Sequence, residues 1–338
     1  MANLGYIQVV RHCNHHCGFC SNPKSTSVHT QATIERLVDD LVERGYYGVI
    51  LTGGEPTLHP DLPAICAYAK AKGLHVRMIT NGSRGPDAVF ARELAAAGLE
   101  LMHVSIYSTR PDVEESIRGV AGTIDRAGAA IDHAHANGIG VNVNCVINRL
   151  NADHLDETAM TLLDRHPFVR HFVWNNLDPS MGRAEANREK YVPRLADFEL
   201  SLRRAARLLQ ERGVTFRIER VPLCYMADFA WASTETRKIV KGEERVVHFL
   251  DEKGTVRQTS WNHVYAPVCR ACTLRSICAG LFERGHGYDP RELHAVFADR
   301  DALVQRILQD PTDPSRAFET LADWRERGDR NRTAPAAG

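Results

Sequence analysis

The sequence predicts an α/β fold, a partial (β/α)6 barrel that is followed by a small cysteine-rich α+β extension. Short runs of β-branched and aromatic residues alternate with amphipathic helical segments through the first half of the 338-residue chain. A loop with three cysteines follows the first of these runs. Beyond about residue 175 the alternation stops, and four further cysteines occur among turns and short strands.

The first half of the chain contains the strands and helices of the barrel. Apolar runs predict strands at residues 6–10, 48–52, 75–80, 101–106, 141–147 and 171–174. Helical periodicity predicts helices at residues 34–44, 62–72, 88–97, 124–137 and 153–165. Strands that alternate with helices through short loops run parallel and are joined by right-handed crossovers. Because six units are fewer than the eight of a closed barrel, we expect an open, TIM-like barrel with its site at the carboxyl ends of the strands.

The second half of the chain has a different pattern. We expect an exit loop at 178–183, a helix at 195–212, a strand at 215–219 and a β-hairpin formed by 245–250 and 255–259. The predicted domains are therefore the barrel, residues 1–180, an auxiliary cysteine domain, 181–288, and a helical tail, 289–338. The Pro/Ala/Gly-rich end of that tail is expected to be disordered.

Composition narrows the class of protein. Hydrophobic residues make up 43% and charged residues 25% of the chain, as in ordinary globular proteins. The formal net charge is zero, so no global field favours nucleic acid or an acidic membrane. Neither a membrane-spanning apolar run nor a signal peptide is present in the sequence. Nine cysteines without an export signal favour metal or redox chemistry over disulfides, and we expect a cytoplasmic protein.

The loop that ends at Cys20 has the spacing C-x3-C-x2-C, with Cys13 and Cys17 as its other cysteines. Three thiolates on one loop can hold three irons of a four-iron cluster, which leaves the fourth iron open to a small molecule. A structural zinc site normally closes with a fourth ligand, which a histidine could supply here. The candidates are His12, His15 and His16.

This spacing, with the aromatic Phe19 before the last cysteine, resembles the radical S-adenosylmethionine (radical SAM) family. The resemblance implies a 4Fe–4S cluster on Cys13, Cys17 and Cys20, with S-adenosylmethionine chelated to the open iron through its amino and carboxylate groups. It implies that the reduced cluster cleaves the sulfonium to a 5′-deoxyadenosyl radical. A flavodoxin or ferredoxin-type protein would then be the electron donor.

A segment after the second predicted strand strengthens this resemblance. Its two glycines permit a close backbone approach to a ligand, and its glutamate adds an acceptor. The segment resembles the GGEP segment of radical SAM enzymes, whose backbone binds the methionine ammonium. The cofactor-binding residues that it implies are Gly53, Gly54, Glu55 and Pro56.

Polar residues after the later strands extend the candidate cofactor site. The resemblance implies contacts with the cofactor from Asn81 after the third strand, Ser105 after the fourth and Asn144 on the fifth. Tyr107 stands where the family often has an acidic residue. Arg118 is implied to pair with the methionine carboxylate, the alternative being a solvated arginine at the start of a helix.

Four cysteines in the second half could ligate a second cluster completely. These are Cys224, Cys269, Cys272 and Cys278, the last three in the spacing C-x2-C-x5-C. That run resembles the SPASM and twitch extensions of radical SAM enzymes and implies one auxiliary 4Fe–4S cluster. A zinc ribbon with the same four ligands is the alternative.

The two remaining cysteines have no such spacing. Cys66 lies in an apolar helical context and is expected to be a packing residue. Cys145 lies on the fifth strand, where it could point into the barrel and donate a hydrogen atom to a substrate radical. The alternative for Cys145 is ordinary core packing.

The resemblance implies an oxidoreductase that takes hydrogen from an unactivated C–H bond, followed by oxidation or bond formation. The cysteine loop comes within the first dozen or so residues, which leaves no room before it for a leader-binding domain. We therefore expect a small-molecule substrate, such as a sugar, nucleoside or antibiotic precursor, in natural-product biosynthesis. One alternative is a maturase that cross-links or epimerises a ribosomally made peptide. Another is a non-enzymatic zinc or electron-transfer protein.

Overall fold

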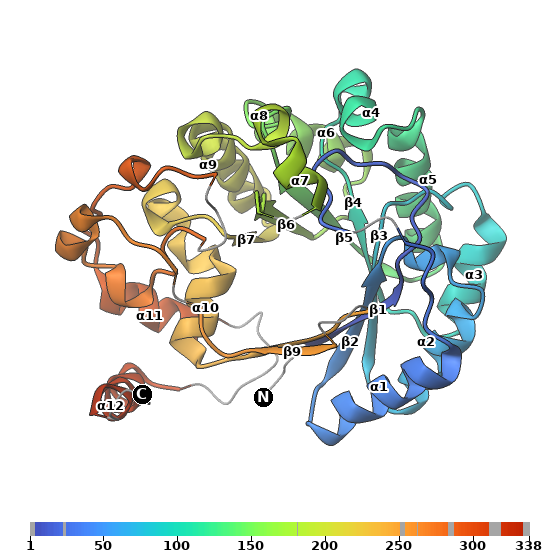
Figure 1. Ribbon diagram of the computed structural model, residues 1–338, viewed down its shortest axis with the longest axis horizontal. Coiled ribbons are helices and arrows are strands. Elements are labelled where there is room, and N and C mark those ends of the chain that lie inside the picture. The colour runs from blue at the N-terminus through green and yellow to red at the C-terminus, as the bar shows by residue number, and fades with distance from the viewer. Residues whose placement is uncertain are drawn as a thin grey trace.

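One curved sheet organises the molecule in the computed structural model, which describes residues 4–22, 25–180, 182–250, 254–261, 263–282, 287–310 and 319–333. Within these ranges nine strands pair in the order β7-β6-β5-β4-β3-β2-β1-β8-β9 (Figure 1). All neighbouring strands are parallel except β8 and β9. Because helices cover the outer face of the curved sheet, the expected partial barrel is confirmed (Figure 1).

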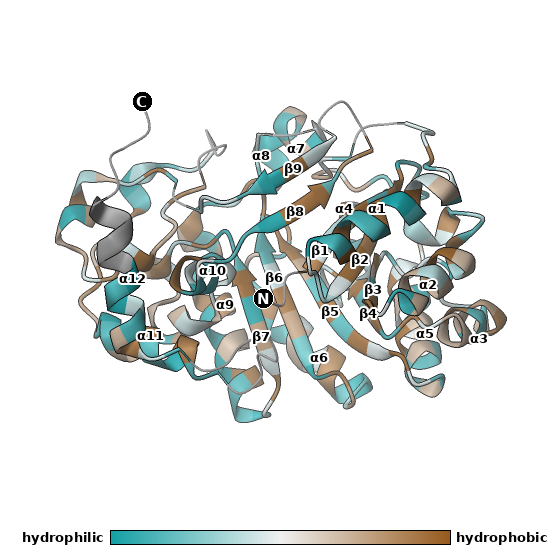
Figure 2. Ribbon diagram, turned by 90° about the horizontal axis from the view of Figure 1, so that it is seen from below, coloured by the Kyte–Doolittle hydropathy of each residue, from teal (hydrophilic) through white to brown (hydrophobic). Residues whose placement is uncertain are grey.

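The strands and helices expected in the first half are present. The strands are β1 (Leu4–Val10), β2 (Gly48–Gly53), β3 (His75–Thr80), β4 (Leu101–Ser105), β5 (Gly140–Ile147) and β6 (His171–Asn176). The expected helices are α1 (Gln31–Glu43), α2 (Leu62–Ala71), α3 (Ala88–Ala96), α5 (Thr123–Ala136) and α6 (Leu155–Arg165). Figure 2 shows the brown, apolar strands β2 to β4 behind the largely teal α1, as expected for helices with a solvent face.

One helix of the barrel was not expected from the sequence. Helix α4 (Pro111–Arg118) begins with a proline at its first position, where the missing N–H costs nothing. Only Val113 and Ile117 among its eight residues are large and apolar, so the segment is too short and too polar to stand out as a helix in the sequence. The helix ends at Gly119, which has a φ of 65° that glycine tolerates without strain.

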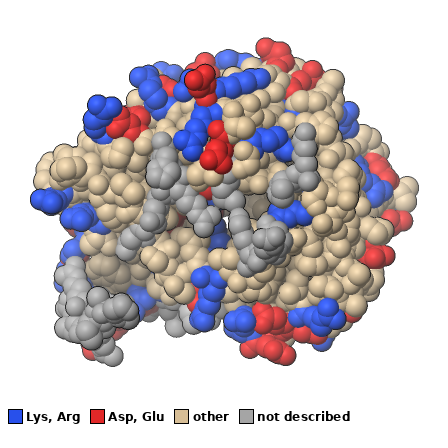
Figure 3. Space-filling view, in the orientation of Figure 1, with Lys and Arg blue, Asp and Glu red and all other residues tan. Residues whose placement is uncertain are grey.

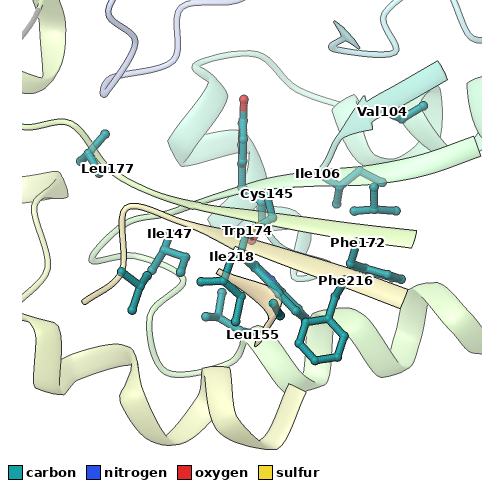
Figure 4. Close-up of a cluster of buried hydrophobic side chains, with 14 of the residues drawn as sticks. Val104, Ile106, Cys145, Ile147, Leu155, Phe172, Trp174, Leu177, Phe216 and Ile218 are labelled. Carbon is teal, nitrogen blue, oxygen red and sulfur yellow. Dashed lines mark hydrogen bonds between the residues drawn. The ribbon is translucent and has the colours of Figure 1, made fainter. Parts of the chain in front are cut away.

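Strand β5 separates an apolar layer from a polar interior. Cys145 and Ile147 pack with Trp174 and Ile218 in a cluster that also contains Leu155 of α6 (Figure 4). Of the two interpretations of Cys145, the structure supports core packing, because its side chain lies in the layer beneath the helices and not in the barrel interior. Side chains alternate along a strand, so the neighbouring asparagines of β5 take the opposite, interior face.

The second half of the chain lies against both edges of the same sheet. Its elements are α7 (Gly182–Ala186), α8 (Arg188–Tyr191), α9 (Leu195–Glu211), β7 (Thr215–Glu219), α10 (Thr234–Lys241), β8 (Arg245–His248), β9 (Thr255–Gln258), α11 (Arg300–Leu308) and α12 (Leu321–Thr333). The expected helix at 195–212, strand at 215–219 and hairpin are confirmed, although the hairpin turn at 251–253 lies outside the described residues. The predicted domain boundaries stay predictions, and the chain end at 334–338 is also outside the description.

Charge and hydropathy agree with the composition. The face drawn in Figure 3 carries basic and acidic side chains interspersed, as a chain with zero net charge allows. In the described part of the chain, every helix is too short or too polar to span a bilayer.

A group of buried charged side chains connects β7, at one end of the sheet, with β8, near the other end. Arg245 of β8 forms an ion pair of 3.3 Å with Glu219 of β7, and its guanidinium lies 5.3 Å from the ring centre of Tyr6. Glu235 of α10 accepts a hydrogen bond of 3.1 Å from the backbone N–H of Arg220. Burial, together with the nearby charge of Glu219, raises the pKa of Glu235 to about 7.

This raised pKa predicts a pH dependence of stability. The folded protein keeps a proton on Glu235 that the unfolded chain releases near its ordinary pKa, about 4.3. Stability should therefore be highest below that value and fall as pH rises towards about 7. Because Glu235→Gln cannot ionise, its apparent melting temperature should rise relative to wild type between pH 5 and pH 8. Melting curves under nitrogen would measure this, with the exposed Glu211→Gln as control, and a difference that stays constant with pH would contradict it.

Candidate functional site

The cysteine loop lies directly after β1 and is held by helices that follow much later in the sequence. Backbone N–H groups of His16 and Gly18 donate to carbonyls at the end of α4 over 2.9 and 3.1 Å. Arg183 of α7 donates from Nε to the carbonyl of Cys17 over 2.8 Å. Its backbone N–H donates to the carbonyl of Cys20 over 3.0 Å. The loop is therefore fastened on two sides.

Several N–H groups point at the sulfur atoms of this loop. The backbone N–H of His15 lies 3.4 Å from Cys13 Sγ, and that of Asn22 lies 3.4 Å from Cys20 Sγ. The side-chain amide of Asn81 lies 3.8 Å from Cys13 Sγ. Hydrogen bonds of this kind favour charge on sulfur and tune the potential of iron–sulfur clusters. The donor set fits a group that binds through thiolate sulfur.

Burial makes these thiols poor acids by themselves. Burial first, and the neighbouring thiols of Cys20 and Cys13 in addition, raise the pKa of Cys17 to about 12. Burial also raises the pKa of Cys13. A thiol shielded in this way ionises when a metal cation binds it. The cysteine loop therefore fits a metal cluster as its resident group.

A closed zinc site is not assembled at this loop. His15 turns Nδ1 toward Arg118 over 3.2 Å, while His12 and His16 are exposed. Throughout the residues that the structure describes, no three His, Cys, Asp or Glu side chains converge as a single metal ion would require. The histidines therefore do not complete a fourth ligand position here.

The double glycine after β2 allows two loops to touch. A Cβ atom on Gly53, whose φ is 137°, would lie 2.1 Å from the carbonyl oxygen of Val10. A Cβ atom on Gly54 would lie 2.0 Å from the carbonyl oxygen of His12. The close backbone approach that we expected toward a ligand is thus made toward the cysteine loop itself. The binding of the methionine ammonium at this segment stays a prediction.

Glu55 links the ends of β2 and β3 from a fully buried position. Its carboxylate accepts hydrogen bonds from Thr57 Oγ1 over 2.7 Å, Thr80 Oγ1 over 2.6 Å and the backbone N–H of Asn81 over 2.7 Å. Burial raises the pKa of Glu55, and these donors act in the opposite direction. Pro56 begins the 3-10 helix η1 (Pro56–Leu58). Glu55 therefore shapes the loops, because its acceptors are already used by the chain.

Arg118 is the centre of a buried polar cluster. Its Nε lies 2.5 Å from Oε1 of Glu114, and both side chains have no exposed surface. Its other nitrogens contact the carbonyl of Asn81 over 3.2 Å, His15 Nδ1 over 3.2 Å and the carbonyl of Ser105. The alternative of a solvated arginine at a helix start is wrong, since Arg118 is the last residue of α4. Its pairing with the methionine carboxylate stays a prediction.

Glu114 is a residue of this cluster that the sequence reasoning missed. Its Oε2 accepts hydrogen bonds from the backbone N–H groups of Tyr107 over 3.0 Å and Ser108 over 2.8 Å. An acidic side chain thus reaches the end of β4, although Tyr107 itself is not acidic. The i,i+4 spacing of Glu114 and Arg118 after Pro111 was the signal that could have predicted it.

Phe19 packs inside the protein. Its ring centre lies 5.0 Å from that of Tyr107 and 6.2 Å from that of Tyr191, both in edge-to-face geometry. Such aromatic pairs stabilise beyond the area that they bury. Phe19 therefore anchors the cysteine loop to the wall of the barrel.

An asparagine pair lies on the interior face of the sheet. Asn144 of β5 accepts a hydrogen bond of 2.9 Å from the side-chain amide of Asn175 of β6. Both side chains are half-buried, in contrast to the fully packed Cys145 and Trp174 on the opposite face. The expected contact of Asn144 with the cofactor stays a prediction.

The structure brings the four cysteines of the second half around one cavity of about 320 Å³. Cys224 comes from the 3-10 helix η2 (Leu223–Tyr225), and Cys269 from η4 (Pro267–Ala271). The backbone N–H of Val296 lies 3.4 Å from Cys272 Sγ, and that of Gly280 lies 3.3 Å from Cys278 Sγ. Four thiols with N–H donors around one cavity fit an iron–sulfur cluster in the same way as the first loop.

Comparisons with known proteins identify the family to which the segment with the first cysteine loop is similar. The sequence model of the Radical SAM superfamily matches residues 7–162. A PqqA peptide cyclase from Ruegeria pomeroyi is 30% identical over 230 residues, which cover 66% of this chain and 59% of the relative. The Fe-coproporphyrin III synthase of Methanosarcina barkeri is 32% identical over 147 residues, 42% of this chain and 36% of the relative. The chain thus matches about three fifths or less of the length of these relatives.

Solved structures share the fold at low sequence identity. SuiB of Streptococcus suis bound to S-adenosylmethionine aligns with a TM-score of 0.63 and 17% identity over 83% of this chain and 73% of that one. The enzyme anSMEcpe with bound AdoMet and Kp18Cys peptide aligns with a TM-score of 0.62 and 13% identity over 91% and 96%. Fold and site define a partial-barrel enzyme with thiolate metal chemistry. This protein belongs to the radical SAM superfamily, whose members use a 4Fe–4S cluster and S-adenosylmethionine.

Proposed function

We propose that this protein is a radical SAM enzyme that modifies a peptide. The similarity to the PqqA peptide cyclase carries the proposal, because its 230 aligned residues extend well beyond the segment matched by the family model. Structures of SuiB with the precursor peptide SuiA and of anSMEcpe with the Kp18Cys peptide have the same fold. Our expectation of a sugar, nucleoside or antibiotic precursor therefore gives way to the peptide alternative.

A small molecule remains the second candidate. The Fe-coproporphyrin III synthase is a relative of comparable identity, and its name denotes a tetrapyrrole product. Its match covers 42% of this chain, against 66% for the peptide cyclase. We rank the peptide first because more of the chain supports it.

In this proposal the cysteine loop and the elements around it have separate roles. Cys13, Cys17 and Cys20 would hold the cluster, and with S-adenosylmethionine it supplies the radical that takes hydrogen from a C–H bond. Helices α4 and α7 hold the loop in place, and the Arg118 cluster closes its inner side against water. The electron would come from a flavodoxin or ferredoxin-type donor in the cytoplasm.

Substrate-dependent cofactor cleavage tests the proposal. The protein would be purified under nitrogen and mixed with S-adenosylmethionine and dithionite. The PqqA, SuiA and Kp18Cys peptides would be added in separate reactions, and coproporphyrin in a fourth. We expect at least one peptide to increase 5′-deoxyadenosine formation and to lose hydrogen by mass spectrometry. Stimulation by coproporphyrin alone would favour the small molecule instead.

The second cysteine group predicts a defined loss of iron. If Cys224, Cys269, Cys272 and Cys278 hold a cluster, the double variant Cys269→Ala/Cys272→Ala should lower iron from about eight to about four per chain. Some 5′-deoxyadenosine should still form because the first loop is intact. The matched control is Cys145→Ala, whose thiol is buried in the apolar layer and should not affect iron. Zinc in the wild-type protein, in place of the second set of iron, would contradict the assignment.

A further inference from the structure

A wide surface groove adjoins the cavity of the four cysteines. It encloses about 910 Å³, and its lining includes Arg270, Arg275 and Arg300. Among the described residues that line it, none is acidic. The groove is therefore a positively charged hollow on a protein whose net charge is zero.

Cys272 connects this groove to the cavity of the four cysteines. The same half-buried side chain lines both hollows, which lie on its two sides. Arg275 and Tyr265 also line both. A metal group on the four cysteines would thus lie directly beneath the floor of the groove, where an electron could cross.

Two of the three arginines form no ion pair with any acidic side chain that the structure describes. Within the described part of the chain, no ion pair joins Arg270 or Arg275 to a carboxylate, although Arg275 lies 5.2 Å over the ring of Tyr265. Arg300 does pair with Asp301 over 2.9 Å. Two exposed cations therefore remain available to a negatively charged partner.

Exposed apolar side chains lie near the groove residues along the chain or are hydrogen-bonded to them through the backbone. Phe297 is 75% exposed, Val268 42% and Val264 40%. Phe297 is held at the groove because the N–H groups on either side of it, those of Val296 and Ala298, bond to Cys272 Sγ and Thr273 Oγ1. An exposed aromatic residue beside arginines is the composition that is enriched in protein interfaces.

We propose that this groove, lined by Arg270, Arg275 and Arg300, docks a small acidic electron-transfer protein of the flavodoxin or ferredoxin kind, with Phe297 as an apolar contact beside it. The proposal rests on the auxiliary cluster assigned above. In each encounter the reduced cofactor of the partner loses one electron, and the cluster at the four cysteines gains it. No atom is transferred, so an acidic surface and a reduced cofactor are all that the partner must provide.

A binding experiment tests the docking without substrate or S-adenosylmethionine. Calorimetry under nitrogen would measure the affinity of the holoprotein for a recombinant flavodoxin, and for cytochrome c as a small basic redox protein. The test variant is Arg270→Glu/Arg275→Glu. The matched control is Arg204→Glu/Arg207→Glu, in another arginine-lined groove of about 850 Å³ that contains no cysteine.

We expect the Arg270→Glu/Arg275→Glu variant to bind flavodoxin about tenfold more weakly than wild type at low salt. The control variant should change affinity less than about twofold, and high salt should weaken the wild-type complex strongly. Equal losses in both variants, no loss in the groove variant, no flavodoxin binding, or equal binding of cytochrome c would each overturn the proposal.

Iron content separates a failure of docking from a failure of the cluster assignment. If the glutamate variant loses iron, Arg270→Gln/Arg275→Gln removes the two charges with less change, and its affinity should also fall. A wild-type protein that lacks the auxiliary iron would overturn the proposed function of the four cysteines. A wild-type protein that keeps this iron but does not bind flavodoxin would overturn the proposed docking site and leave the cluster assignment in place.

Discussion

Replacing Cys17 by alanine should abolish 5′-deoxyadenosine formation and lower iron by about four atoms per chain. Each of the three thiolates is assigned to one iron, and the fourth iron is left for the small molecule. The loop therefore has no spare thiolate that could replace Cys17. Cys17 is also the most deeply buried of the three and is held through its carbonyl by Arg183. Cys13→Ala and Cys20→Ala should have the same result for the same reason.

Matched controls separate this effect from general unfolding. Cys66 is fully buried in α2, and Cys66→Ala removes a thiol of the same type without touching the loop. That variant should keep its iron, its brown absorbance and its cofactor cleavage. Circular dichroism should show an intact fold in both variants. Production of 5′-deoxyadenosine by Cys17→Ala at the wild-type rate would refute the assignment of the loop.

Replacing Arg118 by methionine should lower the free energy of unfolding by about 3–5 kcal/mol. The methionine fills much of the same volume but leaves the carboxylate of Glu114 buried without its cation. The variant also removes the contacts of Arg118 with the ends of β3 and β4. Thermal or urea unfolding under nitrogen would measure the change, and the cysteine loop should bind iron less completely because His15 loses its neighbour.

A double-mutant cycle identifies the buried ion pair as the cause. Glu114→Gln alone should also destabilise the protein, and Glu114→Gln/Arg118→Met should lose less than the sum of the two. The control is Arg194→Met, which breaks an ion pair of 2.8 Å with Asp197 at a position that is 72% exposed. That loss should be much smaller because solvent screens the pair. If Arg118→Met and Arg194→Met unfold alike, the cluster has no structural role.

The strands, helices and cysteine groups of this fold could be predicted because their signals are local. Apolar runs of four to seven residues between turn residues predicted β1 to β6, and the C-x3-C-x2-C spacing predicted a loop for three metal ligands. Helix α4 was missed because it has only eight residues, of which just two are large and apolar. Residues four apart in the sequence face each other only on a helix. Because no helix was predicted at this place, the pairing of Glu114 with Arg118 was not predicted either.

The orientation of Cys145 shows a second limit. Its alternation with the asparagines of β5 was visible in the sequence, but both faces of a barrel strand are buried. The alternation of apolar and polar residues therefore distinguished the two faces of β5, but it did not indicate which face lines the barrel interior. Contacts with Trp174 of β6 and Leu155 of α6 decide that question (Figure 4).

The sequence by itself determined the parallel α/β barrel, the two cysteine groups and the family to which they point, since each depends on residues that are neighbours along the chain. The sequence suggested Cys224, Cys269, Cys272 and Cys278 as one set of ligands, and the tertiary structure brings them around one cavity. It also decided that Arg118 is buried beneath the first loop and that Cys145 faces the helices. These features depend on contacts between residues far apart in the chain, which form only when the sheet has assembled and the helices have packed against it.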